Sequence, residues 1–180
     1  MNEQMTILGS GDYLKLVRRK GWEFATRHNP LVVVIIAWTD DDELVLVEQY
    51  REPIRRRTIE LPAGLVGDLE GQAGETLIEA AARELYEETG YRAEGFREIM
   101  RCPTSAGLTD EIAVFLRAGS PSQVGPGGGD ASEDITVHRI AANRLAGWLQ
   151  TANASGLAVD PKIYAAMVWR EHECDQASPD

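Results

Sequence analysis

The hydrophobic pattern predicts strands in the first part of the chain. Residues 31–38 (LVVVIIAW) are continuously apolar and β-branched, which is typical of a strand buried on both faces. After the acidic turn TDDDE, residues 44–50 (LVLVEQY) predict the antiparallel neighbour of that strand. Upstream, residues 13–19 and 22–28 predict two short strands joined around a Lys-Gly pair, which is a hairpin signal.

The pattern then changes to a helical period. Residues 75–89 predict a helix, and Gly90 is well placed to cap its C-terminus. One stripe of this helix consists of Ile78, Ala82, Leu85 and Thr89, with Ala81 beside it. The other predicted elements are strands over 58–64, 95–101, 111–117 and 135–140, and helices over 141–152 and 161–173. This order predicts an α/β fold, in which a mixed sheet carries helices on both faces.

Length and composition indicate a single domain over residues 1–180. A chain of 180 residues with 43% hydrophobic content is large enough for one sizeable core. Residues 1–30 would supply the N-terminal strands and residues 31–173 the catalytic core, and the tail at 174–180 is expected to be disordered. A Gly/Pro/Ser-rich stretch at 119–134 predicts a long loop before the last strand.

Charge and targeting signals limit the classes of partner. The formal net charge of −11 makes the chain a poor nonspecific binder of nucleic acid. Cys102 and Cys174 fit no metal or redox spacing, which indicates free thiols in a reducing compartment. The start of the chain lacks the basic and apolar regions of a signal peptide, and the longest apolar run is far too short to cross a bilayer. We therefore expect a soluble, cytoplasmic protein with no nucleic-acid or membrane partner.

Three glutamates crowd one side of the predicted helix. At about 100° per residue, Glu84, Glu87 and Glu88 fall within an arc of roughly 100° that borders the apolar stripe. Like charges at i,i+4 cost an isolated helix roughly 0.2–0.5 kcal/mol per pair. The residues alone leave two interpretations open. One is a solvated acidic face in which Glu79, Arg83 and Glu87 pair at i,i+4, and the other is a site for a hard divalent cation such as Mg²⁺.

The residues around this helix extend the pattern into a longer motif. The stretch ELPAGLVGDLEGQAGETLIEAAARELYEETGY resembles the signature of the Nudix hydrolase family. Glu75 precedes Arg83 by the family's seven intervening residues, and the segment from Arg83 to Tyr91 is in register. The interval between Gly64 and Glu75 departs from the family pattern, with ten intervening residues instead of five. The resemblance implies a Nudix-type α/β/α sandwich, with a mixed central sheet and an extra N-terminal antiparallel strand pair.

The resemblance also implies a metal site. Glu84 and Glu88 would be the principal ligands of Mg²⁺ or Mn²⁺, and Glu87 would assist them in metal binding and catalysis. The carbonyl of Ala63 would complete the site, and Arg83 would orient the acidic cluster rather than touch substrate. A cation between the first two carboxylates would turn their repulsion into attraction, which explains the crowding.

Stretches outside the motif resemble the ADP-ribose and nucleoside-diphosphate-sugar pyrophosphatase branch of the family. They are WEFATRHNP, EQYREP, SAGLTDE and SEDITVHRI. The branch implies Mg²⁺-dependent hydrolysis of the diphosphate bond of ADP-ribose or a related nucleotide sugar, giving a nucleoside monophosphate and a sugar phosphate. It also implies a homodimer whose N-terminal strands exchange between subunits. The alternatives are a pyrophosphatase that sanitises nucleoside triphosphates or mutagenic nucleotides, and a non-catalytic Nudix-fold ligand sensor.

The branch resemblance suggests residues that contact substrate. Arg51 leaves a strand end beside the site, and its guanidinium suits bidentate phosphate contact. Trp22 could stack on a nucleobase, or pack in the core or a dimer interface. Arg55, Arg56 and Arg57 are expected to be solvated or to contact another subunit.

The general base needs another carboxylate, because the motif glutamates are committed to metal. In the branch this residue comes from the loop before the last strand, which makes Glu133 the first candidate here. Asp130 and Asp134 are neighbours that could replace it. Glu111 on the SAGLTDE loop is the runner-up and would also contact substrate.

Overall fold

A computed structural model describes residues 5–67, 74–129 and 134–177 of the chain. The helices are α1 (Leu77–Thr89), α2 (Ala142–Ala154) and α3 (Lys162–Ala177), with a short 3-10 helix at Glu52–Ile54. The strands are β1 (Thr6–Ser10), β2 (Lys15–Arg19), β3 (Trp22–Thr26), β4 (Leu31–Ile36), β5 (Glu43–Arg51), β6 (Arg56–Glu60), β7 (Ala63–Leu65), β8 (Tyr91–Arg92), β9 (Gly95–Pro103), β10 (Ile112–Gly119), β11 (Ser122–Gln123), β12 (Thr136–Ala141) and β13 (Ala158–Val159).

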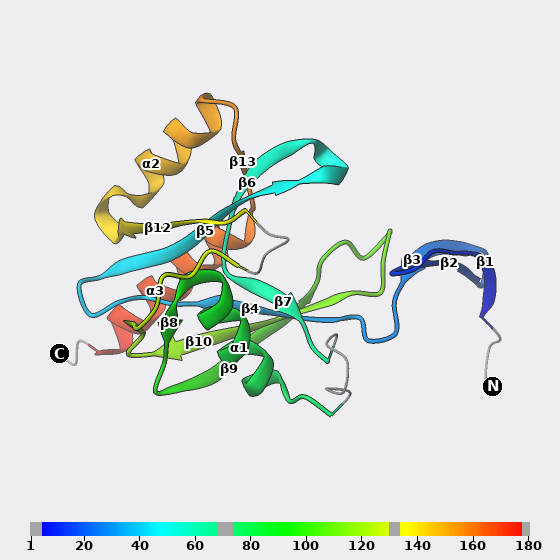
Figure 1. Cartoon of the computed structure of the whole chain (residues 1–180), viewed down its shortest axis with the longest axis horizontal. Coiled ribbons are helices and arrows are strands. Elements are labelled where there is room, and N and C mark those ends of the chain that lie inside the picture. The colour runs from blue at the N-terminus through cyan, green and yellow to red at the C-terminus, as the bar shows by residue number, and fades with distance from the viewer. Residues whose placement is uncertain (1–4, 68–73, 130–133, 178–180) are drawn as a thin grey trace.

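The body of the molecule contains two four-stranded mixed sheets with helices around them (Figure 1). One sheet has the order β7-β4-β10-β9, in which β4 and β10 are parallel and the outer strands antiparallel. The other has the order β12-β5-β6-β13, in which β13 runs parallel to β6 and the other pairs are antiparallel. The predicted α/β class with mixed strand pairing is confirmed, and the mixed pairing is distributed over two sheets.

Strand β4 separates two hydrophobic cores. Val34 lies in a cluster that includes Leu145 of α2 and Ile163 of α3. Its neighbour Val33 lies in a second cluster that includes Leu85 of α1. Because successive strand residues point to opposite faces, this alternation confirms a strand buried on both sides. It also places α1 on the opposite side of the sheet from α2 and α3.

The prediction that residues 44–50 pair with the preceding strand is wrong. Strand β4 has β7 on one edge and β10 on the other, so no edge is left for β5. Strand β5 instead lies between β6 and β12 in the second sheet. A single bridge between Trp38 and Leu44 remains at the turn that carries the chain from one sheet to the other.

The N-terminal hairpin is confirmed as β2 and β3, and β1 adds a third antiparallel strand that the pattern did not predict. All five residues of β1 are exposed, so the strand has no buried face that would give it an alternating pattern. This three-stranded N-terminal arm stands away from the two main sheets (Figure 1). One contact with the body is the backbone hydrogen bond from Ala25 to Leu108, at 2.8 Å.

The C-terminal end also differs from expectation. Helix α3 was expected to end at residue 173, but it continues to Ala177. Residues 174–177 are therefore helical rather than disordered, and the rest of the expected tail lies outside the described residues.

Candidate active site

Helix α1 begins and ends at local signals. The Thr76 hydroxyl accepts a hydrogen bond from the Glu79 N–H at 3.3 Å, and the Glu79 carboxylate accepts one from the Thr76 N–H at 2.8 Å. This reciprocal capping box satisfies two backbone donors of the first turn. Gly90 ends the helix with a φ of 73°, a left-handed conformation that glycine adopts without strain. The positions of the helix glutamates therefore follow from local sequence.

Two of the three crowded glutamates are buried. Glu84 is 9% exposed and Glu88 is 3% exposed, whereas the side chain of Glu87 is 46% exposed. A solvated acidic face would leave all three in water, so that interpretation does not hold for Glu84 and Glu88. Buried carboxylates require hydrogen bonds or opposite charge, and the surrounding residues provide both.

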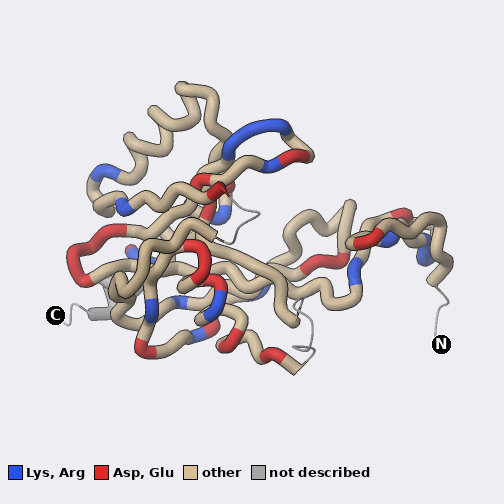
Figure 2. The backbone as a smooth tube through the Cα atoms, viewed as in Figure 1, with Lys and Arg blue, Asp and Glu red and all other residues tan. Residues whose placement is uncertain are grey.

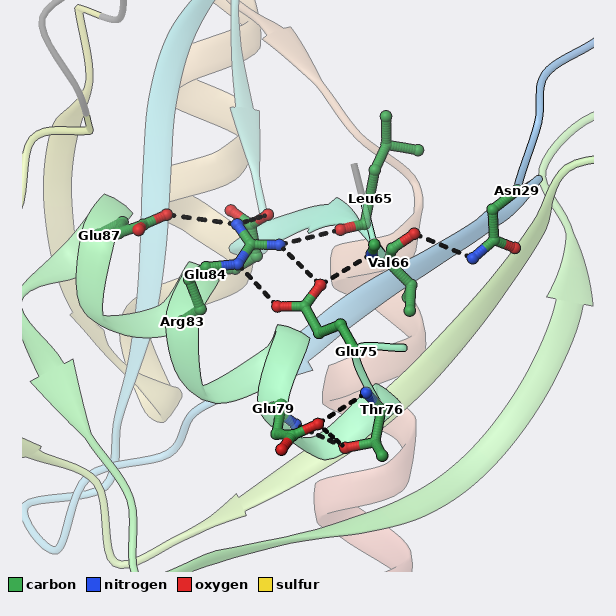
Figure 3. A network of polar contacts seen from close by, with 10 residues as sticks. Asn29, Leu65, Val66, Glu75, Thr76, Glu79, Arg83, Glu84 and Glu87 are labelled. Atoms are coloured by element: carbon green, nitrogen blue, oxygen red, sulfur yellow. Dashed lines mark hydrogen bonds and ion pairs between the residues drawn. The ribbon is translucent and has the colours of Figure 1, made fainter. Parts of the chain in front are cut away.

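Arg83 is the centre of this acidic network (Figure 3). Its guanidinium donates to surrounding acceptors, namely Glu75 at 2.8 and 3.2 Å, Glu84 at 2.7 Å, Glu87 at 3.3 Å and the backbone carbonyl of Leu65 at 3.1 Å. The hydrogen bond from Arg83 lowers the pKa of Glu75, and the same bond raises the pKa of Arg83. Both groups therefore stay charged at neutral pH, and Arg83 holds the Glu84 carboxylate from one side.

Strand β7 approaches the two buried carboxylates from the other side. The Ala63 N–H donates to Glu88 Oε2 at 3.1 Å. At the next residue, a Cβ on Gly64 would lie 1.9 Å from Glu84 Oε1. Only glycine lets the strand pass this close to the carboxylate, which explains the glycine at position 64.

The buried carboxylates open into a cleft of about 440 Å³. Of the residues predicted for the site, the lining includes Arg51, Ala63, Glu84, Glu88 and Glu111. The structure thus brings together groups from β5, β7, α1 and the loop before β10. The titratable lining residues are Arg27, Arg51, Lys162, Glu60, Glu84, Glu88 and Glu111, which give a formal net charge of −1.

Arg51 is held by a carboxylate that the sequence did not single out. Its guanidinium donates to both oxygens of Glu60, with Nε–Oε1 at 2.8 Å and Nη2–Oε2 at 2.6 Å. Glu60 is 7% exposed, and its hydrogen bond raises the pKa of Arg51 against the effect of burial. Glu60 has no local sequence signal, because it ends a strand that reaches Arg51 only through the pairing of β5 with β6.

Glu111 faces a second cleft cation that sequence reasoning missed. Arg27 Nη2 lies 3.3 Å from Glu111 Oε2, and both residues line the cleft. Arg27 follows β3, while Glu111 precedes β10. Their approach depends on the contact between the N-terminal arm and the loop before β10, and no spacing in the sequence indicates it.

Comparison with known proteins identifies the family. Residues 28–153, more than half of the chain, match the NUDIX domain. The chain belongs to the Nudix family. The match contains α1, β7 and every predicted site residue except Trp22, so the Nudix motif and the buried carboxylate pair are the same feature.

Several curated proteins are similar to this Nudix chain. Methanol dehydrogenase activator of Bacillus methanolicus is 37% identical over 62% of this chain and 57% of its own length. ADP-ribose pyrophosphatase of Bacillus subtilis is 40% identical over 49% of this chain and 45% of its own length. ADP-sugar pyrophosphatase of Mus musculus is 31% identical over 84% of this chain and 69% of its own length. The chain thus spans about half the length of the first two relatives.

A solved structure supports the Nudix fold. The crystal structure of an ADP compounds hydrolase superposes with a TM-score of 0.70, at 18% sequence identity. The superposition covers 96% of this chain and 93% of that chain, so the similarity extends beyond the Nudix core to both the N-terminal arm and the C-terminal region. No helix in the described part of the chain is long and apolar enough to cross a membrane.

Some predicted site residues do not line the Nudix cleft. Trp22 is 66% exposed and lines a different pocket of about 460 Å³, between β3 and the loop before β10. Glu87 contacts Arg83 but does not line the cleft. Glu133, the first candidate for the general base, and Asp130 lie outside the described residues. The roles of these residues therefore stay predictions.

Basic residues gather where β5 connects to β6 (Figure 2). Arg57, in β6, does not have the solvated side chain that the sequence predicted. Its side chain is only 28% exposed, and Nε donates to Glu48 Oε1 at 2.6 Å. Nη1 donates to Asp134 Oδ2 at 2.7 Å, and Nη2 to the Asp134 carbonyl at 3.1 Å. These bonds join β5 and β6 to Asp134, two residues before β12, so Arg57 makes an internal contact and is not a solvated side chain. Arg55 and Arg56 are exposed, as expected for solvated side chains.

The buried carboxylate pair fits a divalent cation. Among the residues with described positions, no three His, Cys, Asp or Glu side chains form a complete metal cluster. Mg²⁺ does not need one, because it is usually bound through one or two carboxylates together with substrate phosphates and water. Glu84 and Glu88 supply two such oxygen donors in the cleft.

Proposed function

We propose that this Nudix protein is a divalent-metal-dependent pyrophosphatase that hydrolyses ADP-ribose or a related nucleoside diphosphate sugar. The products would be a nucleoside monophosphate and a sugar phosphate. The observation that carries this proposal is the buried Glu84–Glu88 pair, open to a cleft that also presents Arg51. The relatives named as ADP-ribose and ADP-sugar pyrophosphatases support the substrate class.

The charge of the cleft supports a metal requirement. A lining with a formal net charge of −1 repels a diphosphate, which carries negative charge on each phosphate. Glu84 and Glu88 would hold Mg²⁺ or Mn²⁺, with the Ala63 carbonyl and Glu87 as further proposed ligands. When bound, the cation neutralises phosphate charge and lowers the pKa of bound water. Arg83 would keep the Glu84 carboxylate in place without contacting substrate.

Arg51 would bind a substrate phosphate. A guanidinium offers parallel N–H donors that match two phosphate oxygens. Its bond to Glu60 fixes the side chain against the cleft wall before substrate arrives, which lowers the entropy lost on binding. Part of the guanidinium remains accessible, since the Arg51 side chain is 44% exposed.

The chemical step adds one water molecule across the diphosphate. The water oxygen forms a bond to one phosphorus, the bond from that phosphorus to the bridging oxygen breaks, and a carboxylate accepts the water proton. Glu133 is the proposed acceptor, and Glu111 is the alternative. Glu111 lines the cleft, where its carboxylate lies 3.3 Å from the guanidinium of Arg27.

A homodimer is also proposed, with the N-terminal arm in its interface. The arm carries large exposed apolar side chains, including Ile7 at 59%, Leu16 at 47% and Trp22 at 66%. Stable interfaces bury more than about 1,000 Å², which an arm of three strands can provide. Light scattering should give twice the chain mass of 19.8 kDa, and a species of one chain mass at micromolar concentration would contradict the dimer. Cytoplasmic location stays a prediction.

A substrate panel tests the proposed activity. Purified protein with Mg²⁺ or Mn²⁺ is incubated with ADP-ribose, other nucleotide sugars, dinucleoside polyphosphates and nucleoside triphosphates, and the products are separated by chromatography. Turnover of ADP-ribose or a nucleotide sugar to a monophosphate and a sugar phosphate is expected. Preferential turnover of triphosphates would indicate a sanitising enzyme. Stoichiometric binding without products would indicate a ligand sensor.

A further inference from the structure

The start of α3 is joined to the strand that carries Glu60. Strand β13 pairs in parallel with β6, with Val159 opposite Ile59. The Asp160 N–H continues this pairing by donating to the Ile59 carbonyl at 2.9 Å. Since Ile59 immediately precedes Glu60, the first residues of α3 lie beside the Arg51–Glu60 pair. Lys162, the first residue of α3, lines the cleft.

Asp160 orients Lys162 in two ways. One oxygen of its carboxylate accepts the Lys162 backbone N–H at 2.8 Å, as a helix-capping residue does. The other oxygen contacts the Lys162 ammonium. The lysine side chain is 31% exposed, and Asp160 is 13% exposed. The ammonium is therefore held at the cleft wall instead of extending into solvent.

Arg51 lies among several charged residues along this wall of the cleft. The hydrogen bonding that Arg51 donates to Glu60 is the main cause of the raised pKa of Arg51, and Glu88 and Asp160 add further attraction. Arg51 thus interacts electrostatically with the metal-site carboxylate Glu88 and with Asp160, the residue that holds the Lys162 ammonium. A substrate whose one phosphate lies at the carboxylates can place its second phosphate near Arg51 and Lys162.

We propose that Lys162 binds the substrate diphosphate together with Arg51, at the phosphate farther from the Glu84–Glu88 pair. This inference rests on the proposed function. An ammonium with three donors can keep its contact with Asp160 and still donate to a phosphate oxygen. Lys162 lies beyond residue 153, where the match to the NUDIX domain ends, so this chain supplies the contact from outside the matched region.

Kinetics of a charge-neutral variant test the proposal. Lys162→Gln should raise KM for the best diphosphate substrate about tenfold, as expected for loss of a hydrogen bond to a charged group. It should leave kcat within about twofold, because the lost contact acts on substrate binding and not on the reacting atoms. The KM difference should shrink in high salt. Lys162→Arg should restore part of the affinity.

A matched control removes one positive charge elsewhere. Arg144 is exposed on α2 and lies outside the cleft lining, so Arg144→Gln should leave both constants unchanged. Wild-type KM in Lys162→Gln, measured beside an active wild-type enzyme, would overturn the inference. Failure of wild type itself to turn over any diphosphate would instead refute the proposed function. An equal rise of KM in Arg144→Gln would show that the effect comes from the change in net charge alone. That outcome would also overturn the inference.

Chemical footprinting gives a second measurement that needs no variant. The chain has three lysines, at positions 15, 20 and 162, so amine labelling can be read at each by mass spectrometry. A methylene-bridged ADP-ribose analogue with Mg²⁺ should protect Lys162 from acetylation, while exposed Lys15 serves as the reference within the same sample. Equal labelling of Lys162 with and without the saturating analogue would contradict the contact.

Discussion

Replacing Gly64 with alanine would put a methyl group where the Glu84 carboxylate lies. A Cβ at residue 64 would be 1.9 Å from Oε1 and 2.0 Å from Cδ of Glu84, whereas ordinary contact begins at 3.4 Å. The difference between 3.4 and 1.9 Å requires the carboxylate to retreat by about 1.5 Å. Because β7 is paired with β4 on this edge, the backbone of residue 64 has little freedom to move instead.

The expected loss is in activity more than in stability. The displaced atoms are the end of a flexible side chain, so we expect a cost of about 1 kcal/mol, at the low end for overpacking, and a Tm lower by about 2–4 °C. A misplacement of about 1 Å can cost on the order of a hundredfold in rate. We therefore expect Gly64→Ala to lower kcat/KM about a hundredfold and to raise the Mg²⁺ concentration that gives half-maximal rate.

The assay is hydrolysis of the best substrate from the panel across a Mg²⁺ titration, with thermal unfolding measured in parallel. Gly95→Ala is the control, because a Cβ there meets nothing within 4 Å and Gly95 also lies in a strand. Wild-type kcat/KM and an unchanged Mg²⁺ requirement in Gly64→Ala would refute the reasoning. An equal loss of activity in Gly95→Ala would also refute the reasoning.

Three further predictions concern the proposed catalytic groups. Glu84→Gln or Glu88→Gln should reduce kcat by several orders of magnitude while circular dichroism shows an intact fold, and near-wild-type turnover in either would remove it from the metal site. Arg51→Ala should lower kcat/KM about ten- to a hundredfold and also lower Tm, because it leaves a buried carboxylate without its bidentate partner. Arg51→Lys should recover part of both, and an Arg51→Ala enzyme with wild-type kinetics would make this arginine purely structural. Glu133→Gln should lower kcat about a hundredfold or more and remove the acidic limb of the pH–rate profile, with little change in Mg²⁺ affinity; if Glu111→Gln gives that result and Glu133→Gln does not, the base is Glu111.

Features that depend on residues close together in the sequence were predictable. The helical period and the Gly90 terminus indicated where α1 lies in the chain, and the structure adds the capping box at Thr76. Residues four positions apart on a helix are neighbours in any fold, so the Glu84–Glu88 pair could be identified before the tertiary structure was known. The continuous apolar run of β4 required burial on both faces for the same local reason, and the structure confirms it.

Features that depend on strand pairing were not predictable in this way. The short strands β8, β11 and β13 have two residues each, too few for a period to appear. The assignment of β5 to β4 failed because pairing depends on which sheet edges are already occupied, and a hydrophobic pattern carries no such information. The partial burial of Arg57 likewise depends on Glu48 of β5 and on Asp134, which lies before β12.

The sequence by itself therefore determined the Nudix motif, its helix and the carboxylate pair, because local periodicity and spacing encode them. Tertiary structure decided what surrounds that pair. Pairing of β5 with β6 brings Glu60 to Arg51, and pairing of β13 with β6 brings Lys162 into the cleft. The contact between the N-terminal arm and the loop before β10 places Trp22 in a different pocket. These contacts join residues on different strands and loops, and only the closing of the sheets sets the distances between them.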